Sequence, residues 1–323
     1  MNNPWNNIEI PRANLNVLRV SATHPLPLYW GKDSRGLYNF LADIPSDAMP
    51  AKKELPELIG IRASVFPSGR SEKLVFTLND TQDWGIFLAL CTDLIHASEK
   101  AESPTAAVKI ILLRLARWRE FLKRPRNEAM TEARIKGLIG ELLFLENPLA
   151  AKFGWDYAVS FWKGPEGAPQ DFAVHDTAIE VKCQAGSSRP FVEITSVEQL
   201  NAQLPKFFLV VQTLASADEN DKLGFSLNSL VSRIRAGMVH ASSASQEVFE
   251  TLLFQAGYLP LPDYAEKSFQ SVSMHSFEVC ENFPRLKGNE IPDGIEKISY
   301  QLSLDAIAHF ESEVSFPAVS END

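Results

Sequence analysis

Cysteine and histidine are both scarce in this sequence. The chain has three cysteines among 323 residues, Cys91, Cys183 and Cys280, which are far apart and odd in number, and six histidines. No two cysteines and no two histidines have the short spacing of a zinc-type ligand pair. The sequence therefore argues against a metal site built on cysteine or histidine and favours a reduced, cytoplasmic setting.

Long hydrophobic runs are also lacking. The most apolar helical candidate, residues 108–118, is interrupted by Arg114 and Arg117, so no segment is expected to span a bilayer. The first seven residues, MNNPWNN, show no basic region followed by an apolar stretch, so no signal peptide is expected. The sequence also lacks the G-x-S-x-G elbow of serine hydrolases and a Walker-type phosphate loop. A membrane partner and these two chemistries are therefore not expected.

Positive charge is in deficit over the whole chain. Thirty-one Lys and Arg face 41 Asp and Glu, a net charge of −10, which argues against coating nucleic acid by bulk electrostatics. Residues 109–136 reverse the balance, with nine basic against three acidic side chains. The run is either a solvated helix face or a ridge that contacts phosphate groups. Its basic residues are Lys109, Arg114, Arg117, Arg119, Lys123, Arg124, Arg126, Arg134 and Lys136.

The length and the order of patterns predict two domains. Residues 1–125 are read as a strand-rich region followed by helices, and as a candidate docking region for a partner protein or DNA. Strands are expected within 25–41, 59–66 and 73–78, and helices begin near Gln82 and Pro104. Residues 126–323 form the second domain. There, helices are expected at 196–204, 226–238 and 245–256, and a buried central strand at 206–212.

The second domain begins with an amphipathic helix over residues 131–146. Its apolar side chains follow helical spacing, and Asn147-Pro148 is expected to end it. Gly137 and Gly140 each cost about 1 kcal/mol relative to alanine inside a helix, so close backbone contact with another element is expected. Glu141 lies at the edge of the apolar stripe and is either a surface residue or a carboxylate that points into the structure.

The most informative stretch is residues 169–184, preceded by a predicted strand at 155–162. Two short apolar runs flank His175-Asp176, a pattern typical of a β-hairpin. If these two residues form the loop, Asp171 lies opposite Glu180, with Cβ atoms about 5 Å apart. Alternation along the strand then places Lys182 and Gln184 on the face of Glu180. The pattern predicts a site where two carboxylates hold one hard cation, or else a surface turn.

These residues resemble the PD-(D/E)XK nuclease superfamily. Pro169-Gln-Asp171 stands for the first half of the motif, with one residue inserted, and Glu180-Val-Lys182 fits the second half. The helix that carries Glu141 matches the one that supplies an extra acidic residue in many members. The likeness is closest to the bacterial proteins described as "putative PD-(D/E)XK family member", and Pro284-Arg-Leu286 supports it. It covers residues 130–310 and is weaker for the N-terminal part.

The resemblance implies a fold, an activity and roles for residues. The expected fold is an α/β (α+β) restriction-endonuclease-like αβββαβ core with a mixed sheet. The implied function is Mg²⁺-dependent hydrolysis of DNA phosphodiester bonds, with Mn²⁺ as the other candidate cation, in a restriction or phage-defence system with partner proteins. An oligomer is compatible with this. The alternative is an inactive nuclease-fold subunit that binds DNA or protein. The expected metal ligands are Asp171, Glu180 and Glu141, and Lys182 and Gln184 are expected to act on the attacking water or the phosphate.

Overall fold

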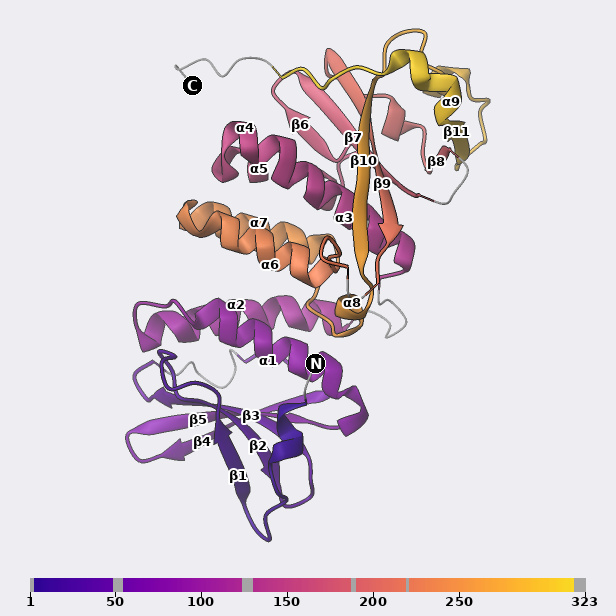
Figure 1. Ribbon diagram of the computed structural model, residues 1–323. Helices are drawn as coiled ribbons and strands as arrows, with labels where there is room; N and C mark the ends of the chain where they lie inside the picture. The colour runs from indigo at the N-terminus through magenta and orange to yellow at the C-terminus, as the bar shows by residue number, and fades with distance from the viewer. Residues whose placement is uncertain (1–2, 49–54, 124–129, 187–189, 219–220, 317–323) are drawn as a thin grey trace. The chain divides into compact units, whose positions relative to one another are not determined.

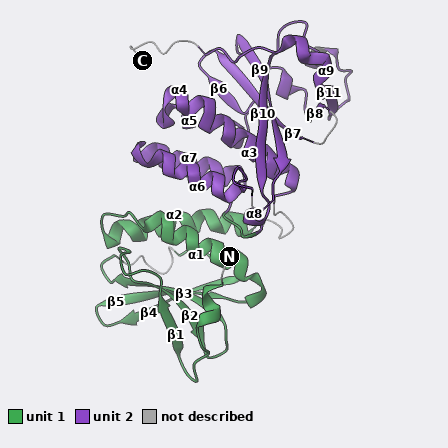
Figure 2. Ribbon diagram, viewed as in Figure 1, with its two compact units in different colours: residues 1–129, 260–262 green, residues 130–259, 263–323 purple. Residues whose placement is uncertain are grey.

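The computed structural model describes residues 3–48, 55–123, 130–186, 190–218 and 221–316. It divides into two compact units, residues 1–129 with 260–262 and residues 130–259 with 263–323 (Figure 2). The predicted domain boundary at 125/126 falls in residues 124–129, outside the described residues. Within the described residues, no helix is long and apolar enough to cross a membrane.

Unit 1 contains a five-stranded antiparallel sheet in the order β1-β2-β3-β5-β4 (Figure 1). The strands predicted within 25–41, 59–66 and 73–78 are confirmed. In β3 and β5 several consecutive residues are buried, so both faces of these two strands are covered. The elements are η1 (Pro4–Asn7), β1 (Leu15–Arg19), β2 (Leu28–Asp33), β3 (Tyr38–Pro45), β4 (Ile61–Ser68), β5 (Ser71–Leu78), η3 (Thr81–Asp83), α1 (Trp84–Ser98) and α2 (Pro104–Leu122).

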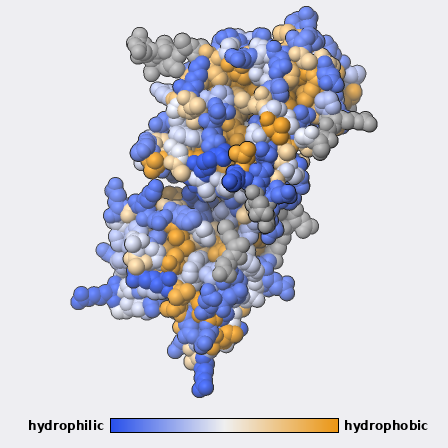
Figure 3. Space-filling model, viewed as in Figure 1, coloured by the Kyte–Doolittle hydropathy of each residue, from blue (hydrophilic) through white to orange (hydrophobic). Residues whose placement is uncertain are grey.

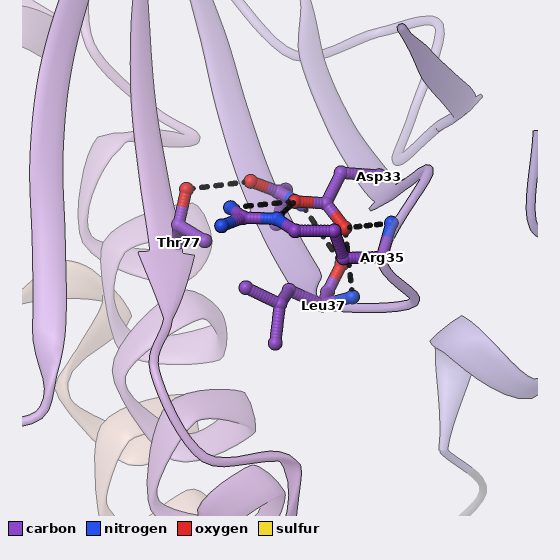
Figure 4. Close-up of polar contacts among 5 residues, drawn as sticks. Asp33, Arg35, Leu37 and Thr77 are labelled. Carbon is purple, nitrogen blue, oxygen red and sulfur yellow. Dashed lines mark hydrogen bonds and ion pairs between the residues drawn. The ribbon is translucent and has the colours of Figure 1, made fainter. Parts of the chain in front are cut away.

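The turn between β2 and β3 is closed by one carboxylate. Asp33 Oδ1 accepts hydrogen bonds from the backbone N–H groups of Arg35 and Leu37, both at 2.9 Å (Figure 4). The Arg35 guanidinium lies 3.2 Å from Asp33 Oδ2. Deeper in the sheet, the Thr77 hydroxyl donates to Asn39 Oδ1 at 2.7 Å. These side chains bond to backbone and to each other, so they are structural.

The two helices of unit 1 begin at caps that the sequence indicates. Asp80 accepts a bond from Gln82 N at the start of η3, which leads into α1. Ser103 caps α2, and Pro104 occupies its first turn. Buried Trp118 on α2 donates through Nε1 to Asp93 Oδ2 at 2.9 Å, which ties α2 to α1.

Unit 1 exposes several large apolar side chains. Figure 3 shows hydrophobic side chains among hydrophilic ones on the visible face of this unit. The edge strand β1 contributes Val17 and Leu18, which are 50% and 48% exposed, and Phe66 on the opposite edge strand β4 is 54% exposed. The strand-rich part of the chain therefore presents apolar surface at both of its edges.

Unit 2 has a mixed α/β fold built on a four-stranded sheet in the order β10-β9-β7-β6, and a small β8–β11 pair (Figure 1). This confirms the predicted fold class. β7 and β9 are parallel, and the outer pairs are antiparallel. The elements are α3 (Glu132–Phe144), η4 (Leu145–Ala150), α4 (Ala151–Phe153), α5 (Trp155–Phe161), η5 (Gly164–Glu166), β6 (Phe172–Val174), β7 (Thr177–Ala185), β8 (Phe191–Ile194), η6 (Glu198–Leu200), β9 (Lys206–Ser216), α6 (Leu227–Gly237), η7 (Met238–His240), α7 (Ser243–Gln255), α8 (Asp263–Glu266), β10 (Phe269–Glu278), η8 (Gly288–Glu290), β11 (Tyr300–Ser303), α9 (Leu304–Ile307) and η9 (Ala308–Phe310).

The sheet of unit 2 is packed on both faces. On one face α3 lies against β7, next to Val181 and Cys183. On the other face, Leu209 and Val211 of β9 join a buried cluster with side chains from β8, β11 and α9. Burial on both faces explains the continuous apolar run of β9, which confirms the predicted central strand.

Residues 155–162 form a helix, so the predicted strand is wrong. Trp155–Phe161 is α5, and only Trp162 forms an isolated bridge, with Phe172. The aromatic and β-branched residues suggest a strand, but Ala158 and Val159 bury one helical face. Asp156 in the first turn also accepts bonds from Ser242, which fixes the start of the helix.

The predicted helix at 196–204 is reduced to the single turn of η6. Side-chain amides take the backbone partners that a longer helix would use. Asn201 Nδ2 donates to the carbonyl oxygens of Val197 and Leu286 at 2.7 and 2.8 Å, and Gln199 Oε1 accepts from Thr195 N. The chain between β8 and β9 is therefore largely irregular.

The basic run at 109–136 is partly neutralised by carboxylates. Lys123 lies 3.0 Å from Glu120, and Lys136 lies 2.7 Å from Glu132. Arg114 is 3.7 Å from Asp93. Arg119 also pairs with Glu120. Arg124 and Arg126 lie outside the described residues. The exposed pairs of Arg119 and Lys123 fit a solvated helix face, whereas the side chains of Arg114 and Lys136 are mostly buried.

Candidate active site

The hairpin β6–β7 has the predicted register. Phe172 pairs with Ile179 and Val174 with Thr177, so Asp171, just before β6, lies opposite Glu180. His175 has a φ of 53°, the left-handed conformation that a tight two-residue turn requires. Its ring also packs edge-on against Phe161, with centroids 5.4 Å apart. The turn therefore holds Asp171 and Glu180 on the same side of the hairpin, as predicted.

Asp171 is held from both sides by backbone groups. Its Oδ2 accepts a hydrogen bond from Val181 N at 2.8 Å. Its carbonyl oxygen accepts bonds from the N–H groups of Lys163 and Gly164, at 2.7 and 3.0 Å. Among the residues that the structure describes, the bond from Val181 N is the one hydrogen bond to the carboxylate; it fixes the orientation of the side chain and leaves Oδ1 available for a ligand.

Glu180 is the most deeply buried charge of the site. It is 2% exposed, and its Oε1 lies 2.9 Å from Nζ of Lys182, which is 14% exposed. Both project from the same face of β7, as the alternation predicts. Among the described residues, Oε2 of Glu180 has no hydrogen-bond partner although it is buried. An unpaired buried carboxylate oxygen is costly, so Oε2 is an acceptor that a bound cation or water would satisfy.

Glu141 reaches the site from α3 because that helix approaches β7 closely. A Cβ on Gly140 would collide with Sγ of Cys183 and lie 3.3 Å from Val181 Cγ1, so only glycine allows this approach. The predicted close contact is confirmed for Gly140. A Cβ on Gly137 would meet nothing within 4 Å, so for Gly137 that prediction is wrong. Glu141 Oε2 accepts a hydrogen bond from Trp162 Nε1 at 2.7 Å.

Three carboxylates and one ammonium thus meet beside the β6–β7 hairpin. The point where a Cβ on Gly164 would lie is 2.8 Å from Asp171 Oδ1 and 3.3 Å from Glu141 Oε2, so both oxygens border the same position. Burial raises the pKa of Asp171 to about 6. Burial, and then the charge of Asp171, raise the pKa of Glu180 to about 8.

The same two causes raise the pKa of Glu141 well above its usual value. The Lys182 ammonium opposes the rise for all three carboxyl groups. If all three are ionised, their charge exceeds that of Lys182 by two, which a divalent cation would neutralise.

Two other residues singled out by the sequence have structural contacts. Gln184 lies on the same face of β7, but its Nε2 donates to Thr213 Oγ1 on β9 at 2.9 Å. Its buried Oε1 has no partner among the described residues. Arg285 donates to the carbonyl oxygen of Leu200 at 2.7 Å. Within the described part of the chain, neither forms a hydrogen bond or ion pair with the three carboxylates.

Sequence reasoning missed Trp162 and Gly164. Trp162 stood at the end of a presumed strand, and Gly164 lay in a loop full of turn-forming residues. The only sequence signal was their position, seven to nine residues before Asp171. Their contact with Glu141, more than twenty residues earlier, depends on how α3 packs.

The donor set of the site fits a hard divalent cation. Carboxylate oxygens are the ligands that Mg²⁺ prefers, and the unpaired Glu180 Oε2 is a buried oxygen that needs a partner. Within the described residues, no group of three or more His, Cys, Asp or Glu side chains is placed so that it could hold a metal ion. Mg²⁺ commonly binds through one or two carboxylates and completes its shell with water and phosphate oxygens, so a partial protein set is compatible with it.

The fold and the site together define a nuclease-like protein of the PD-(D/E)XK class. The helix glutamate, the aspartate before β6 and the Glu-x-Lys of β7 are the residues that the sequence resemblance matched to that motif. The chain belongs to the family described as "Putative PD-(D/E)XK family member", whose model matches residues 1–305. The match includes the N-terminal unit, beyond the 130–310 on which the sequence resemblance rested. No curated protein and no solved structure matches the chain.

Proposed function

We propose that this protein is a Mg²⁺-dependent DNA endonuclease that hydrolyses phosphodiester bonds. The observation that carries the proposal is the convergence of Glu141, Asp171 and Glu180 around Lys182, with the pKa of each carboxyl group raised by burial. A packed interior that gathers three ionised carboxylates is destabilised by their repulsion unless they take up protons or a cation binds them. A purely structural hairpin has no need of this arrangement.

Asp171, Glu180 and Glu141 would hold the cation through carboxylate oxygens. When bound, a divalent cation lowers the pKa of a coordinated water and neutralises charge on the phosphate. Lys182, fixed by its 2.9 Å pair with Glu180, would orient the water or stabilise developing negative charge. Gln184 is a weaker candidate for contact with the phosphate, because its amide is already bonded to Thr213.

Family membership supports the wider setting of the proposal. The resemblance associates such proteins with bacterial restriction or anti-phage defence. A net charge of −10 gives little general attraction for DNA, so partner proteins would supply targeting. The substrate and the partners are then DNA and other proteins of such a system.

The test is cleavage of supercoiled and linear DNA with Mg²⁺, with Mn²⁺ and with a chelator. We expect cleavage by the wild type only with a cation, and a loss of at least about 100-fold in D171A and K182A. D176N is the matched control, because Asp176 is an exposed carboxylate of the same hairpin that pairs with Lys206. Equal cleavage by the wild type, D171A and K182A, or no cleavage by the wild type with its partners present, would refute the proposal.

A second candidate is a nuclease-fold subunit that binds DNA or protein without catalysis. One observation favours it: Glu180 Oε1 already has an internal cation, Lys182. If this pair is permanent, Glu180 is withheld from the metal. DNA binding that is unchanged by Mg²⁺ and by D171A, without cleavage, would identify this function.

A further inference from the structure

One short segment contacts both Glu141 and Asp171. Trp162, Lys163 and Gly164 follow α5 directly. The indole of Trp162 donates to the Glu141 carboxylate, and the next two backbone N–H groups donate to the carbonyl of Asp171. The segment therefore links a residue of α3 to the residue that precedes β6.

The Trp162 indole is well placed to fix the Glu141 side chain. It is fully buried, and its position is set by the bridge to Phe172 and by contact with the Phe249 ring, 6.2 Å away between centroids. An indole has one donor and no acceptor, so its 2.7 Å bond holds one carboxylate oxygen without adding charge. A glutamate held in this way loses rotamer freedom before any ligand arrives.

Gly164 keeps space open between the two carboxylates. A Cβ at this position would lie 2.8 Å from Asp171 Oδ1, 3.3 Å from Asp171 Cα and 3.3 Å from Glu141 Oε2. The first distance is shorter than ordinary contacts allow, and Asp171 is held by its backbone bonds. The φ angle of Gly164 lies outside the left-handed region, so the need for glycine comes from space and not from backbone conformation.

We propose that Trp162 and Gly164 are positioning residues that keep Glu141 Oε2 and Asp171 Oδ1 directed at one open position, where a divalent cation and its water bind. Trp162 sets the orientation of the Glu141 carboxylate, and the absence of a side chain at Gly164 leaves space for the cation. The inference rests on the proposed function, because it assigns these residues to the same site. It adds that the neutral indole N–H of Trp162 and the lack of a side chain at Gly164 control the affinity for the cation.

The first test measures binding of Mg²⁺ and of Mn²⁺ by calorimetry in the full chain. We expect W162F and G164A to bind each cation about 10–100-fold more weakly, the usual effect of losing support behind a ligand. W118F is the control for W162F, because Trp118 is equally buried and its indole also donates to a carboxylate, Asp93. G288A is the control for G164A.

Gly288 also begins a 3₁₀ turn, and a Cβ there would meet nothing within 4 Å. Both controls should bind as the wild type does. Thermal unfolding of each variant, followed by circular dichroism, ensures that binding is measured on folded protein.

The second test is a spectroscopic signature of Trp162. In ¹⁵N-labelled protein, the indole N–H signal that disappears in W162F belongs to Trp162. We expect paramagnetic Mn²⁺ to broaden this signal in the wild type and to leave it sharp in D171A. Broadening in the wild type that is lost in D171A places the bound cation beside the Trp162 indole, whereas an indole signal that stays sharp in the wild type would overturn the inference.

The outcomes separate this inference from the proposed function. Unchanged affinity in both W162F and G164A overturns the inference, while metal-dependent cleavage lost in D171A would keep the nuclease. Weakened affinity without any cleavage by the wild type supports the inference and refutes the nuclease. No cation binding by the wild type overturns both.

Discussion

Glu180→Gln should make the metal-free protein less sensitive to rising pH. Glu180 is 2% exposed, and its pKa is raised from 4.5 to about 8 by burial and by the charge of Asp171. Because the folded pKa is above the unfolded one, its contribution to stability is fully present below pH 4.5 and is lost as the pH rises towards 8. Glutamine has nearly the same shape but does not ionise.

The size of the effect follows from these two pKa values. Between pH 6 and pH 8, linkage gives a loss of about 2 kcal/mol in the free energy of unfolding from Glu180 alone. For a unit of this size, that corresponds to a fall of about 4–8 °C in the melting temperature. Asp171 and Glu141 also have raised pKa values. The stability of E180Q should therefore still fall between pH 6 and pH 8, but by less than that of the wild type.

The assay is thermal or urea unfolding at pH 6 and pH 8 in the presence of a chelator. D176N is the control, because the pKa of exposed Asp176 is lowered by the Thr177 hydroxyl and by Lys206, so this variant should keep the full wild-type fall. If E180Q loses as much stability as the wild type between the two pH values, the buried-carboxylate argument is wrong. Adding Mg²⁺ at pH 8 should raise the wild-type melting temperature more than that of E180Q.

Three further substitutions test the packing and charge of the site by chemical denaturation. G140A should cost about 1–3 kcal/mol of stability because its methyl group meets the Cys183 thiol, and adding C183A should recover much of it, whereas additive losses would contradict the contact. G137A should stabilise by about 0.5–1 kcal/mol, since its Cβ has free space in α3, and a loss would show an unrecognised contact. K182M should cost about 3 kcal/mol at pH 8 and less at pH 6, because it leaves ionised Glu180 without its cation, and an equal cost at both pH values would refute this.

The hairpin could be predicted from sequence because its information is local. The two-residue turn at His175-Asp176 fixes the register, and the register fixes which side chains share a face. The close packing of α3 on β7 at Gly140 could also be predicted, since a glycine that weakens a helix needs a compensating contact. These features depend on spacing within a few residues, which a single sequence shows.

The rest of the site depends on packing between distant segments. The hydrogen bond from Trp162 to Glu141 requires the end of α5 to pack close to α3. The hydrophobic periodicity of the sequence does not indicate which helices pack together. The misread α5 has the same origin, because its composition suggests a strand while Asp156 is bonded to Ser242, 86 residues later. Tertiary contacts override local preference at these positions.

The raised pKa values of the three carboxyl groups imply that protons and a cation would compete for the site. Without a cation, burial favours protonated carboxyl groups, so the site would hold protons in place of metal. A binding cation must displace those protons, which makes its affinity rise with pH. Only after this exchange would the surplus negative charge around Lys182 be neutralised and a phosphate be accepted. If the proposed cation site is correct, the three carboxylates would couple cation binding to substrate binding, and each would strengthen the other by the same free energy.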